Sequence, residues 1–176
     1  MTELLFAGKH LELVKDGRWE FVRRTTASAV VAIIAVTPAD EILLVEQRRL
    51  PVDASVIELP AGLVGDEDAG EDLLVAANRE LDEETGWTVK DLRVLNRGPS
   101  SAGLTSEVVT LIHAQHLTRT SAGGGVPGKG ITVHAVPRKQ IVPWLAARAQ
   151  AGQLIDHKVH AGLWWLSLAC GSPIHA

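Results

Sequence analysis

A cluster of charged residues in the middle of the chain has the composition of a metal site: Arg79, Glu80, Glu83 and Glu84. Glu80 and Glu84 are four residues apart, a spacing that places two side chains about one turn apart on one helix face. Carboxylates this close repel one another, which favours a compensating cation. A hard divalent cation such as Mg²⁺ prefers oxygen ligands and can bridge carboxylates to phosphate oxygens. The alternative is a solvated acidic face with Arg79 as a surface ion pair.

The spacing around the cluster separates these two interpretations. The fixed positions, with five, seven, one and one residues between them, are Gly65, Glu71, Arg79-Glu80-Leu81, Glu83-Glu84 and Gly86-Trp87. This series resembles the sequence box of the Nudix hydrolases at each fixed position. The resemblance favours the metal site over the solvated acidic face.

The resemblance implies a loop–helix–loop that binds Mg²⁺ or Mn²⁺ and hydrolyses a nucleoside diphosphate linked to another moiety. In family terms, Glu80 and Glu84 are similar to the principal metal ligands, and Glu83 to a further ligand or base. Arg79 would orient them, and we expect it to pair with Glu71 or a neighbouring carboxylate. The resemblance also implies that the backbone carbonyl of Ala61 binds metal. Metal ions there would neutralise pyrophosphate charge and lower the pKa of the attacking water.

Two glycines compete for the first position of the box. In many relatives the box glycine ends a Pro-Ala-Gly strand terminus, which is Gly62 in this chain. The loop would then be three residues longer than in those relatives, and Gly65 restores the formal spacing. Both assignments stay open at the level of sequence.

Segments outside the box resemble the ADP-ribose pyrophosphatases and the related GDP-mannose hydrolases: Val45–Arg49, Ile57–Gly62 and Ser101–Glu107. The similarity extends from about Trp19 to Leu168. The residues that this resemblance assigns to substrate binding are Arg49, Glu58, Leu63, Trp19, Ala102 and Gly103.

Three charged residues in these segments have competing interpretations. Arg49 would bind phosphates or the terminal ribose, a role suited to a planar multidentate donor, or it is a surface arginine at a strand edge. Glu58 would be a substrate-binding or a structural carboxylate. Glu107 would face the diphosphate or its metal-bound waters, or it is a surface residue at the start of a strand.

The chain departs from this branch at two points. Ala102 stands where the branch carries a proline. The chain also has no carboxylate between Glu107 and Asp156, although relatives carry an acidic base in the loop that precedes a strand like Ile131–His134. Either Glu83 or Glu107 therefore deprotonates the water, or metal coordination alone acidifies it.

The resulting hypothesis is a pyrophosphatase that converts ADP-ribose to AMP and ribose 5-phosphate. The alternatives are hydrolysis of GDP-mannose or another nucleotide sugar, and a non-catalytic module that senses a nucleotide sugar. Trp19 is expected to stack on the nucleobase, because relatives use an aromatic residue from this region, often across a dimer. Trp164 and Trp165, in an apolar segment, are expected in core or dimer packing. We therefore expect a homodimer.

Composition bounds the class of protein. A chain of 176 residues with 46% hydrophobic and 22% charged residues is typical of one globular domain. A net charge of -4 argues against a nucleic-acid partner, because such proteins carry clustered basic residues. The start of the chain lacks a secretory pattern, and the apolar run Ala27–Val36 is too short to span a membrane, so we expect a cytoplasmic protein.

The predicted elements form a single α/β domain, a Nudix α/β/α sandwich with a mixed central sheet and an N-terminal β-hairpin. Residues 1–26 would form the hairpin element, 27–170 the hydrolase domain and 171–176 a tail. Asp16-Gly17 between alternating apolar runs predicts the hairpin in His10–Arg24. Further strands are predicted at Ala29–Val36, Ile42–Gln47, Val56–Leu59, Val89–Leu95, Val108–Ala114 and Ile131–Val136. Helices are predicted at Asp68–Thr85, Trp144–Gln150 and His157–Leu168, the last with Asp156 as N-cap, and glycine-rich Ser121–Gly130 is expected to be a mobile loop.

Overall fold

The computed structural model describes the chain except residues 66–67, 69, 126–129 and 171–176, and except the side chain of Cys170. The predicted tail thus lies outside the described residues. The strands are β1 (Glu3–Ala7), β2 (Leu11–Asp16), β3 (Trp19–Arg24), β4 (Ala29–Val36), β5 (Glu41–Arg49), β6 (Ala54–Glu58), β7 (Ala61–Val64), β8 (Trp87–Thr88), β9 (Asp91–Pro99), β10 (Val108–Gln115), β11 (Thr118–Arg119), β12 (Thr132–Pro137) and β13 (Leu154–Ile155). The α-helices are α1 (Leu73–Thr85), α2 (Ile141–Gln150) and α3 (His157–Cys170), and short 3-10 turns cover Leu50–Val52 and Arg138–Gln140.

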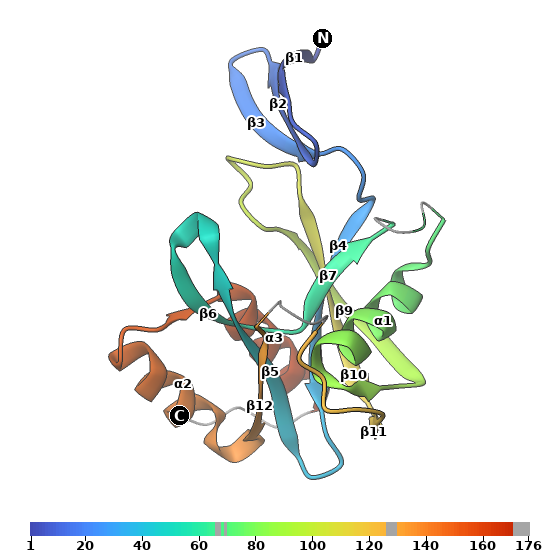
Figure 1. The fold of residues 1–176 in the computed structure, drawn as a ribbon, viewed down its shortest axis with the longest axis vertical. Helices are drawn as coiled ribbons and strands as arrows, with labels where there is room; N and C mark the ends of the chain where they lie inside the picture. Colours follow the sequence, from blue (N-terminus) through green and yellow to red (C-terminus); the bar gives the residue numbers. More distant parts are fainter. Residues whose placement is uncertain (66–67, 69, 126–129, 171–176) are drawn as a thin grey trace.

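The central sheet is mixed, as predicted, and its strand order is visible only in the structure (Figure 1). In the described part of the chain the order is β13-β6-β5-β4-β10-β9, with β12 pairing β5 and β7 pairing β4. β10 runs parallel to β4, and β13 runs parallel to β6. Strand β4 changes its neighbour along its length, from β7 at Ala29–Ala32 to β5 at Ala35–Val36. The chain from Glu58 to Ala61 therefore crosses between two parts of the sheet.

Helices cover both faces of this sheet, which confirms the α/β/α sandwich. Alternate residues of β4 point to opposite faces, as in any strand. Val31 and Ile33 pack with Leu81 of α1 in one buried cluster. Ile34 packs in the other, whose members from α2 and α3 include Ile141, Leu145, Val159, Leu163 and Leu166.

Helix α1 begins later than predicted. It starts at Leu73, and Asp72 is its N-cap, accepting hydrogen bonds from the backbone N–H groups of Leu74 and Val75 at 2.8 and 3.3 Å. Asp68, the predicted start, instead accepts a hydrogen bond from the backbone of Gly70 in the preceding loop. An aspartate whose side chain accepts from the backbone N–H groups two and three residues ahead caps a helix. Asp156 takes the predicted role at α3 and accepts from the backbone N–H of Lys158 at 2.7 Å.

Strand β7 was not predicted as a strand of its own. The Pro-Ala-Gly segment was expected to end β6, but Ala61 begins a new strand that pairs antiparallel with β4, with Ala61 opposite Ala32. Its four residues are too few to show an alternating pattern. This pairing holds the Ala61 backbone beside helix α1.

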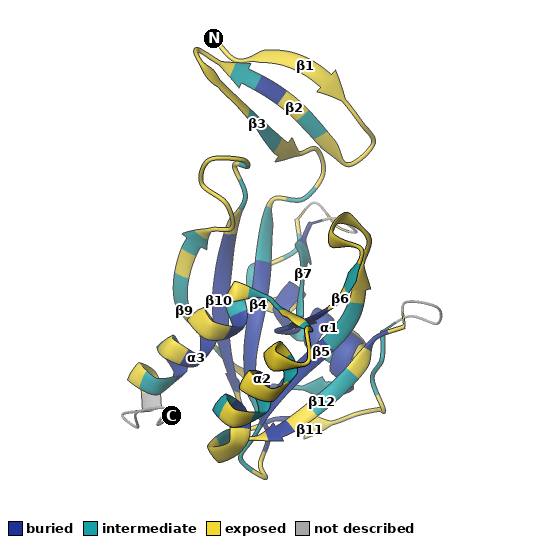
Figure 2. Cartoon of the chain, turned by 90° about the vertical axis from the view of Figure 1, so that its left-hand side faces the viewer, coloured by how far each residue is buried: buried dark blue, intermediate teal, exposed yellow. Residues whose placement is uncertain are grey.

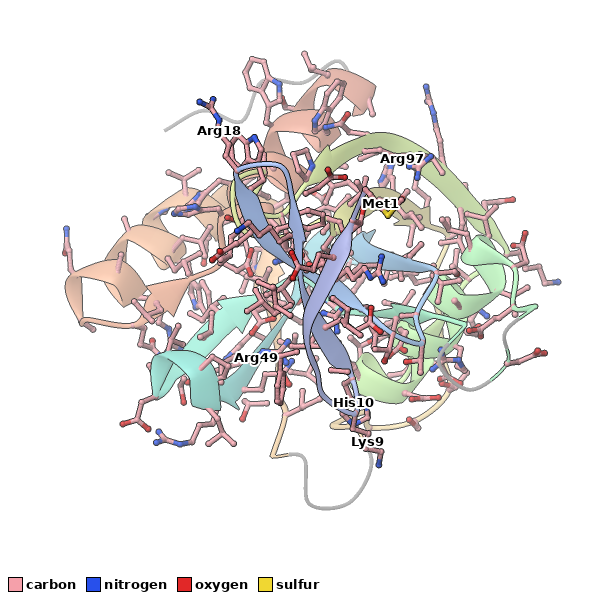
Figure 3. All side chains as sticks on the ribbon, turned by 90° about the horizontal axis from the view of Figure 1, so that it is seen from above. Met1, Lys9, His10, Arg18, Arg49 and Arg97 are labelled. Carbon is pink, nitrogen blue, oxygen red and sulfur yellow. The ribbon has the colours of Figure 1, made fainter. Side chains whose placement is uncertain are left out.

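The N-terminal element is a three-stranded antiparallel sheet rather than a hairpin. The predicted hairpin is present as β2 and β3, with Gly17 at φ 58 in the turn. The strand that was missed is β1, whose sequence lacks polar–apolar alternation. Figures 1 and 2 show this sheet standing above the rest of the molecule with mostly exposed residues. In Figure 3 its two turns, marked by Arg18 and by Lys9 and His10, lie at opposite ends of the sheet.

The N-terminal sheet contacts the rest of the chain through the loop between β9 and β10. The backbone N–H of Val22 donates to the carbonyl of Leu104 at 2.9 Å, and the N–H of Ser106 donates to the carbonyl of Val22 at 3.0 Å. The sheet and this loop thus form one continuous edge above the sandwich. No helix in the described part of the chain is long and apolar enough to cross a membrane.

Candidate functional site

Helix α1 presents two of its glutamates inward. Glu80 and Glu84 are only 7% and 5% exposed, whereas Glu83, one position before Glu84, is exposed. The i and i+4 spacing places the two buried carboxylates on the face that also packs Leu81 and Ala77 onto the sheet. The structure therefore brings together the two predicted metal ligands, at the border of the apolar core.

The two candidate box glycines have different functions. A Cβ atom at Gly62 would overlap the carboxyl carbon of Glu80, so Glu80 lies directly against the backbone of β7. Gly65 has φ 79, and its N–H points to Glu71 with an N–O distance of 3.4 Å. Gly62 thus makes space for a carboxylate, while Gly65 permits a left-handed turn that most other residues resist.

Arg79 holds the loop and the helix together. Its Nε and Nη2 donate to Glu71 at 2.9 and 3.2 Å, and its Nη1 donates to Glu80 at 2.9 Å. Nη2 also donates to the backbone carbonyl of Leu63 at 3.3 Å, and Glu83 lies 3.5 Å from Nη1. The predicted pair with Glu71 is confirmed. The hydrogen bond from Arg79 lowers the pKa of Glu71, so this carboxylate stays charged.

Glu84 is the most perturbed carboxylate of the cluster. Burial, helped by the nearby charges of Glu80 and Glu58, raises the pKa of Glu84 to about 7, although a hydrogen bond from the Ala61 N–H and the charge of Arg49 oppose the rise. That hydrogen bond is 3.1 Å long and ends on Oε2. A cation bound here would offset the cost of burying a negative charge and keep Glu84 ionised.

Arg49 and Glu58 form a two-pronged ion pair beside Glu84. The Nε and Nη2 atoms of Arg49 each donate to one carboxylate oxygen of Glu58 at 2.6 Å. Glu58 is buried at the end of β6, and the Arg49 side chain, at the end of β5, is partly open to solvent. The hydrogen bonds that Arg49 donates to Glu58 raise the pKa of Arg49. A fork–fork pair fixes the guanidinium plane, so the orientation of Arg49 is set before any ligand arrives.

The donor set of the cluster fits a hard divalent cation. Two buried carboxylates and the Ala61 backbone supply oxygen atoms, which Mg²⁺ and Mn²⁺ prefer. Within the described ranges, no three His, Cys, Asp or Glu side chains meet as a complete metal site. Mg²⁺ usually takes only one or two protein carboxylates and fills its remaining positions with water and phosphate oxygens. The cluster is thus of the kind that binds the ion together with a phosphorylated substrate.

Four residues assigned to the site lie apart from this cluster within the chain. Ala102 and Gly103 are exposed in the loop that contacts the N-terminal sheet. The carboxylate of Glu107 accepts from Nε and Nη2 of Arg24, both at 2.7 Å, so it links the same loop to β3. Trp19 is 54% exposed at the distal turn of the N-terminal sheet. These four residues form a second group. Leu63, another of the residues assigned to substrate binding, lies on β7, where its carbonyl accepts a hydrogen bond from Arg79.

The glycine-rich loop contributes to the site through its backbone. The N–H groups of Gly124 and Gly125 donate to the carbonyls of Glu84 and Glu83 at 2.8 and 2.9 Å. A Cβ atom at Gly123 would overlap the backbone of Thr85. The described part of the predicted mobile loop, Ser121–Gly125, is therefore fastened to the C-terminal end of α1, and its remainder through residue 129 lies outside the described residues. The run of glycines was the only sequence signal for this contact.

Comparison with known proteins assigns the family. Residues 26–154 match the model of the NUDIX domain. The chain is 34% identical to the methanol dehydrogenase activator of Bacillus methanolicus, over 71% of this chain and 69% of that protein. It is 34% identical to the ADP-ribose pyrophosphatase of Bacillus subtilis (strain 168), over 66% of this chain and 64% of that protein, just under two thirds of it. It is 30% identical to the GDP-mannose pyrophosphatase of Enterobacter sp. (strain 638), over 73% of this chain and 67% of that protein.

A solved structure shares the fold. The crystal structure of an ADP compounds hydrolase superposes with a TM-score of 0.63 at 22% identity, covering 81% of this chain and 80% of that one. The match supports the sandwich architecture. Together with the domain match and the carboxylate cluster on α1, it leads to one conclusion: the chain belongs to the Nudix hydrolase family.

Proposed function

We propose that this protein hydrolyses the pyrophosphate bond of a nucleoside diphosphate sugar in the presence of Mg²⁺ or Mn²⁺, and that its substrate is ADP-ribose, which it converts to AMP and ribose 5-phosphate. The observation that carries the proposal is the buried pair Glu80 and Glu84 against the Ala61 backbone, with the preoriented Arg49 beside it. Similarity to the ADP-ribose pyrophosphatase of Bacillus subtilis supports the choice of substrate.

In this reaction the oxygen of a water molecule bonds to one phosphorus of the pyrophosphate, and the bridging P–O bond breaks. Glu80, Glu84 and the Ala61 carbonyl would hold the divalent cation, which neutralises phosphate charge and acidifies water. Arg49, held by Glu58, would bind the diphosphate through its outward N–H groups. Arg79 donates hydrogen bonds to both Glu80 and Glu71 and would hold these carboxylates in fixed positions.

Glu83 is the carboxylate that we propose as the proton acceptor. It lies on α1 next to Glu84, it is exposed to solvent, and its contact with Arg79 is the longest of that group at 3.5 Å. Glu107 is engaged by two nitrogens of Arg24, which favours a structural role within one chain. With Glu83 as the base, the departing proton of the water moves to a residue that is free to exchange it with solvent.

The substrate is tested by measuring kcat/KM for ADP-ribose, GDP-mannose and other nucleotide sugars with Mg²⁺. The ADP-ribose value should exceed the others by at least about tenfold, the scale that a few selective contacts supply. EDTA should abolish turnover, and added Mg²⁺ should restore it. Glu84→Gln should abolish turnover, while Glu83→Gln should lower kcat. A larger kcat/KM for GDP-mannose would overturn the assignment to ADP-ribose.

A non-catalytic regulatory module is the second candidate. Its support is the absence of any carboxylate between Glu107 and Asp156 and the similarity to the methanol dehydrogenase activator of Bacillus methanolicus. A sensor has no need for two buried carboxylates with metal-ligand spacing, which is why we place it second. Calorimetric binding of ADP-ribose without hydrolysis of any compound in the panel would decide for the sensor.

We also propose that the protein is a homodimer joined through the N-terminal sheet. Large apolar side chains stay exposed on this sheet in the single chain: Leu4, Leu5, Phe6, Leu11, Leu13 and Trp19. Phe6 is opposite Leu13 and shares a face of the sheet with Leu11 and Leu13, and a monomer seldom leaves a large apolar patch uncovered. A second copy that covers it would also bring its Trp19 near the site of its partner, where it could stack on the nucleobase.

A further inference from the structure

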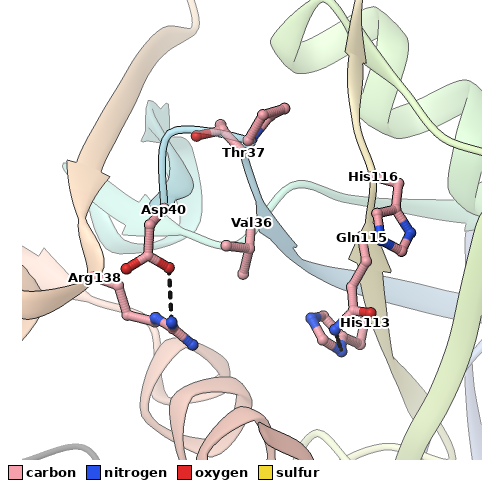
Figure 4. A pocket seen from close by; sticks show the side chains of 8 residues that line it. Val36, Thr37, Asp40, His113, Gln115, His116 and Arg138 are labelled. Atoms are coloured by element: carbon pink, nitrogen blue, oxygen red, sulfur yellow. Dashed lines mark hydrogen bonds and ion pairs between the residues drawn. The ribbon is translucent and has the colours of Figure 1, made fainter.

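A pocket of about 320 Å³ lies at the opposite end of β4 from the carboxylate cluster. It is lined by residues that include Val36, Thr37, Asp40, His113, Gln115 and Arg138 (Figure 4). Ala32 of β4 is opposite Ala61, and Val36 lies four residues further along the strand. At about 3.3 Å per residue the two sites are roughly 13 Å apart along β4. The pocket is therefore separate from the proposed active site.

His113 forms a wall of this pocket and carries an unsatisfied hydrogen-bond donor. The side chain is buried, with 3% exposure, and the Gln115 Nε2 lies 3.3 Å from its Nδ1. An amide nitrogen can only donate, so Nδ1 accepts and the neutral ring carries its proton on Nε2. This Nε2 is buried and has no hydrogen-bond partner among the residues that the structure describes. Buried donors are nearly always paired in folded proteins, so the exception calls for an acceptor from outside the chain.

The charges around the pocket favour a negatively charged acceptor. Burial lowers the pKa of His113, and the positive charges of Arg93 and Arg138 lower it further. The lowered pKa favours the neutral ring, and two guanidinium groups lie near enough to act on it. Arg138 donates from Nη2 to Asp40 at 2.8 Å at the pocket wall. The other charged groups nearby are His116 and Asp91, which face each other at 3.4 Å on the exposed rim.

We propose that this pocket binds a small anion, whose phosphate or carboxylate oxygens accept hydrogen bonds from Nε2 of His113 and from the guanidinium of Arg138. The volume is at the lower end of small-molecule sites, which favours a ligand smaller than a nucleotide sugar. Nε2 is out of contact with solvent and Gln115 contacts the other ring nitrogen, so the anion reaches Nε2 only when the His113 ring turns toward the pocket. The apolar wall at Val36 would contact the rest of the ligand.

The test is a titration of the full ¹⁵N-labelled chain followed by the imidazole nitrogen resonances. Inorganic phosphate and acetate are added separately, with sodium chloride holding the ionic strength constant. The His113 Nε2 resonance should shift and saturate with at least one of the two anions, and the one that saturates at lower concentration identifies the preferred group. No saturable shift with either anion overturns the proposal and leaves a buried water as the acceptor.

Two substitutions break the same ion pair but should change anion binding in opposite directions. They therefore separate anion binding from a structural effect of losing the pair. Arg138→Gln removes a charged donor and should weaken binding by about tenfold, the worth of one charge-assisted hydrogen bond. Asp40→Asn removes the competing carboxylate and should tighten binding, and asparagine tolerates the φ of 60° at this position. Arg148→Gln on α2, which removes a cation stacked on Trp144, should leave the affinity unchanged. Equal affinities for Arg138→Gln and wild type would contradict the proposal.

Discussion

In the proposed metal site Glu84 would have to be both buried and charged, and these two requirements oppose each other. Burial raises its folded pKa to about 7 from an unperturbed value near 4.5. A group with a raised folded pKa contributes stability that is fully present below pH 4.5 and is lost as the pH rises through about 7. Without metal, the protein should therefore become less stable across this pH window.

Glu84→Gln should remove this pH dependence, because glutamine is neutral and can still accept the Ala61 N–H bond. In EDTA the variant should be more stable than wild type at pH 8, by up to about 3 kcal/mol, and much closer to it at pH 5. Urea unfolding at both pH values measures the difference. Saturating Mg²⁺ should reverse the order at pH 8, because only wild type gains binding energy. Parallel pH profiles in EDTA would show that the buried carboxylate has an ordinary pKa.

The two box glycines give a prediction that distinguishes a glycine needed to make space for a side chain from one needed for its backbone conformation. Gly62→Ala should displace Glu80, because the added Cβ overlaps its carboxyl carbon, and Mg²⁺ affinity should fall by more than about tenfold. Gly65→Ala strains a residue at φ 79 and should cost about 1 kcal/mol in stability with a smaller effect on Mg²⁺. Calorimetry with Mg²⁺ and urea unfolding measure the two effects. If Gly65→Ala impairs Mg²⁺ binding more than Gly62→Ala, the assignment of Gly62 is wrong.

At the scale of elements, the end of α1 depends on the loop Ser121–Gly125. Its backbone N–H groups bind the Glu83 and Glu84 carbonyls, which an isolated helix leaves without partners. Gly123→Ala adds a Cβ that overlaps Thr85 and should detach the loop, lowering both the melting temperature and kcat. Gly130→Ala is the matched control, because it has the same sign of φ at 62° but no atom of the described residues near the added Cβ. Equal losses in the two variants would mean that backbone strain alone is responsible.

The elements show where local sequence information ends. Strand β4 has the predicted bounds, Ala29–Val36, because eight consecutive residues rich in β-branched side chains are buried on both faces. The cluster on α1 was predictable because its spacing follows the helical period. Strand β1 and strand β7 were missed because five and four residues show no periodicity, and they form only by pairing with a partner. The Arg49–Glu58 pair was not predictable from a local pattern either, because the register of β5 and β6 places Arg49 opposite Ala54 and Glu58 opposite Val45, and only the side chains bring the two charges together.

At the scale of the whole molecule, the N-terminal sheet is joined to the sandwich by few contacts. Backbone hydrogen bonds link Val22 to Leu104 and Ser106, and the side chains of Arg24 and Glu107 form an ion pair. Neither of the two large buried clusters of the sandwich includes a residue of this sheet. A small sheet gains independent stability by burying an apolar face. A second copy covering that face would supply the burial that the single chain lacks.

Two surfaces are candidates for the dimer interface, the N-terminal sheet and helix α3, because α3 also exposes a large aromatic side chain, Trp164. Phe6→Ser on the N-terminal sheet should convert the dimer to a monomer at micromolar concentration, since it removes a large apolar contact from the centre of the proposed interface. Trp164→Ser is the matched control and should leave the dimer intact. Sedimentation velocity over a concentration series measures both. The opposite result, a monomer only with Trp164→Ser, would place the interface at α3. The KM for ADP-ribose should rise with Phe6→Ser only if the partner's sheet completes the substrate site.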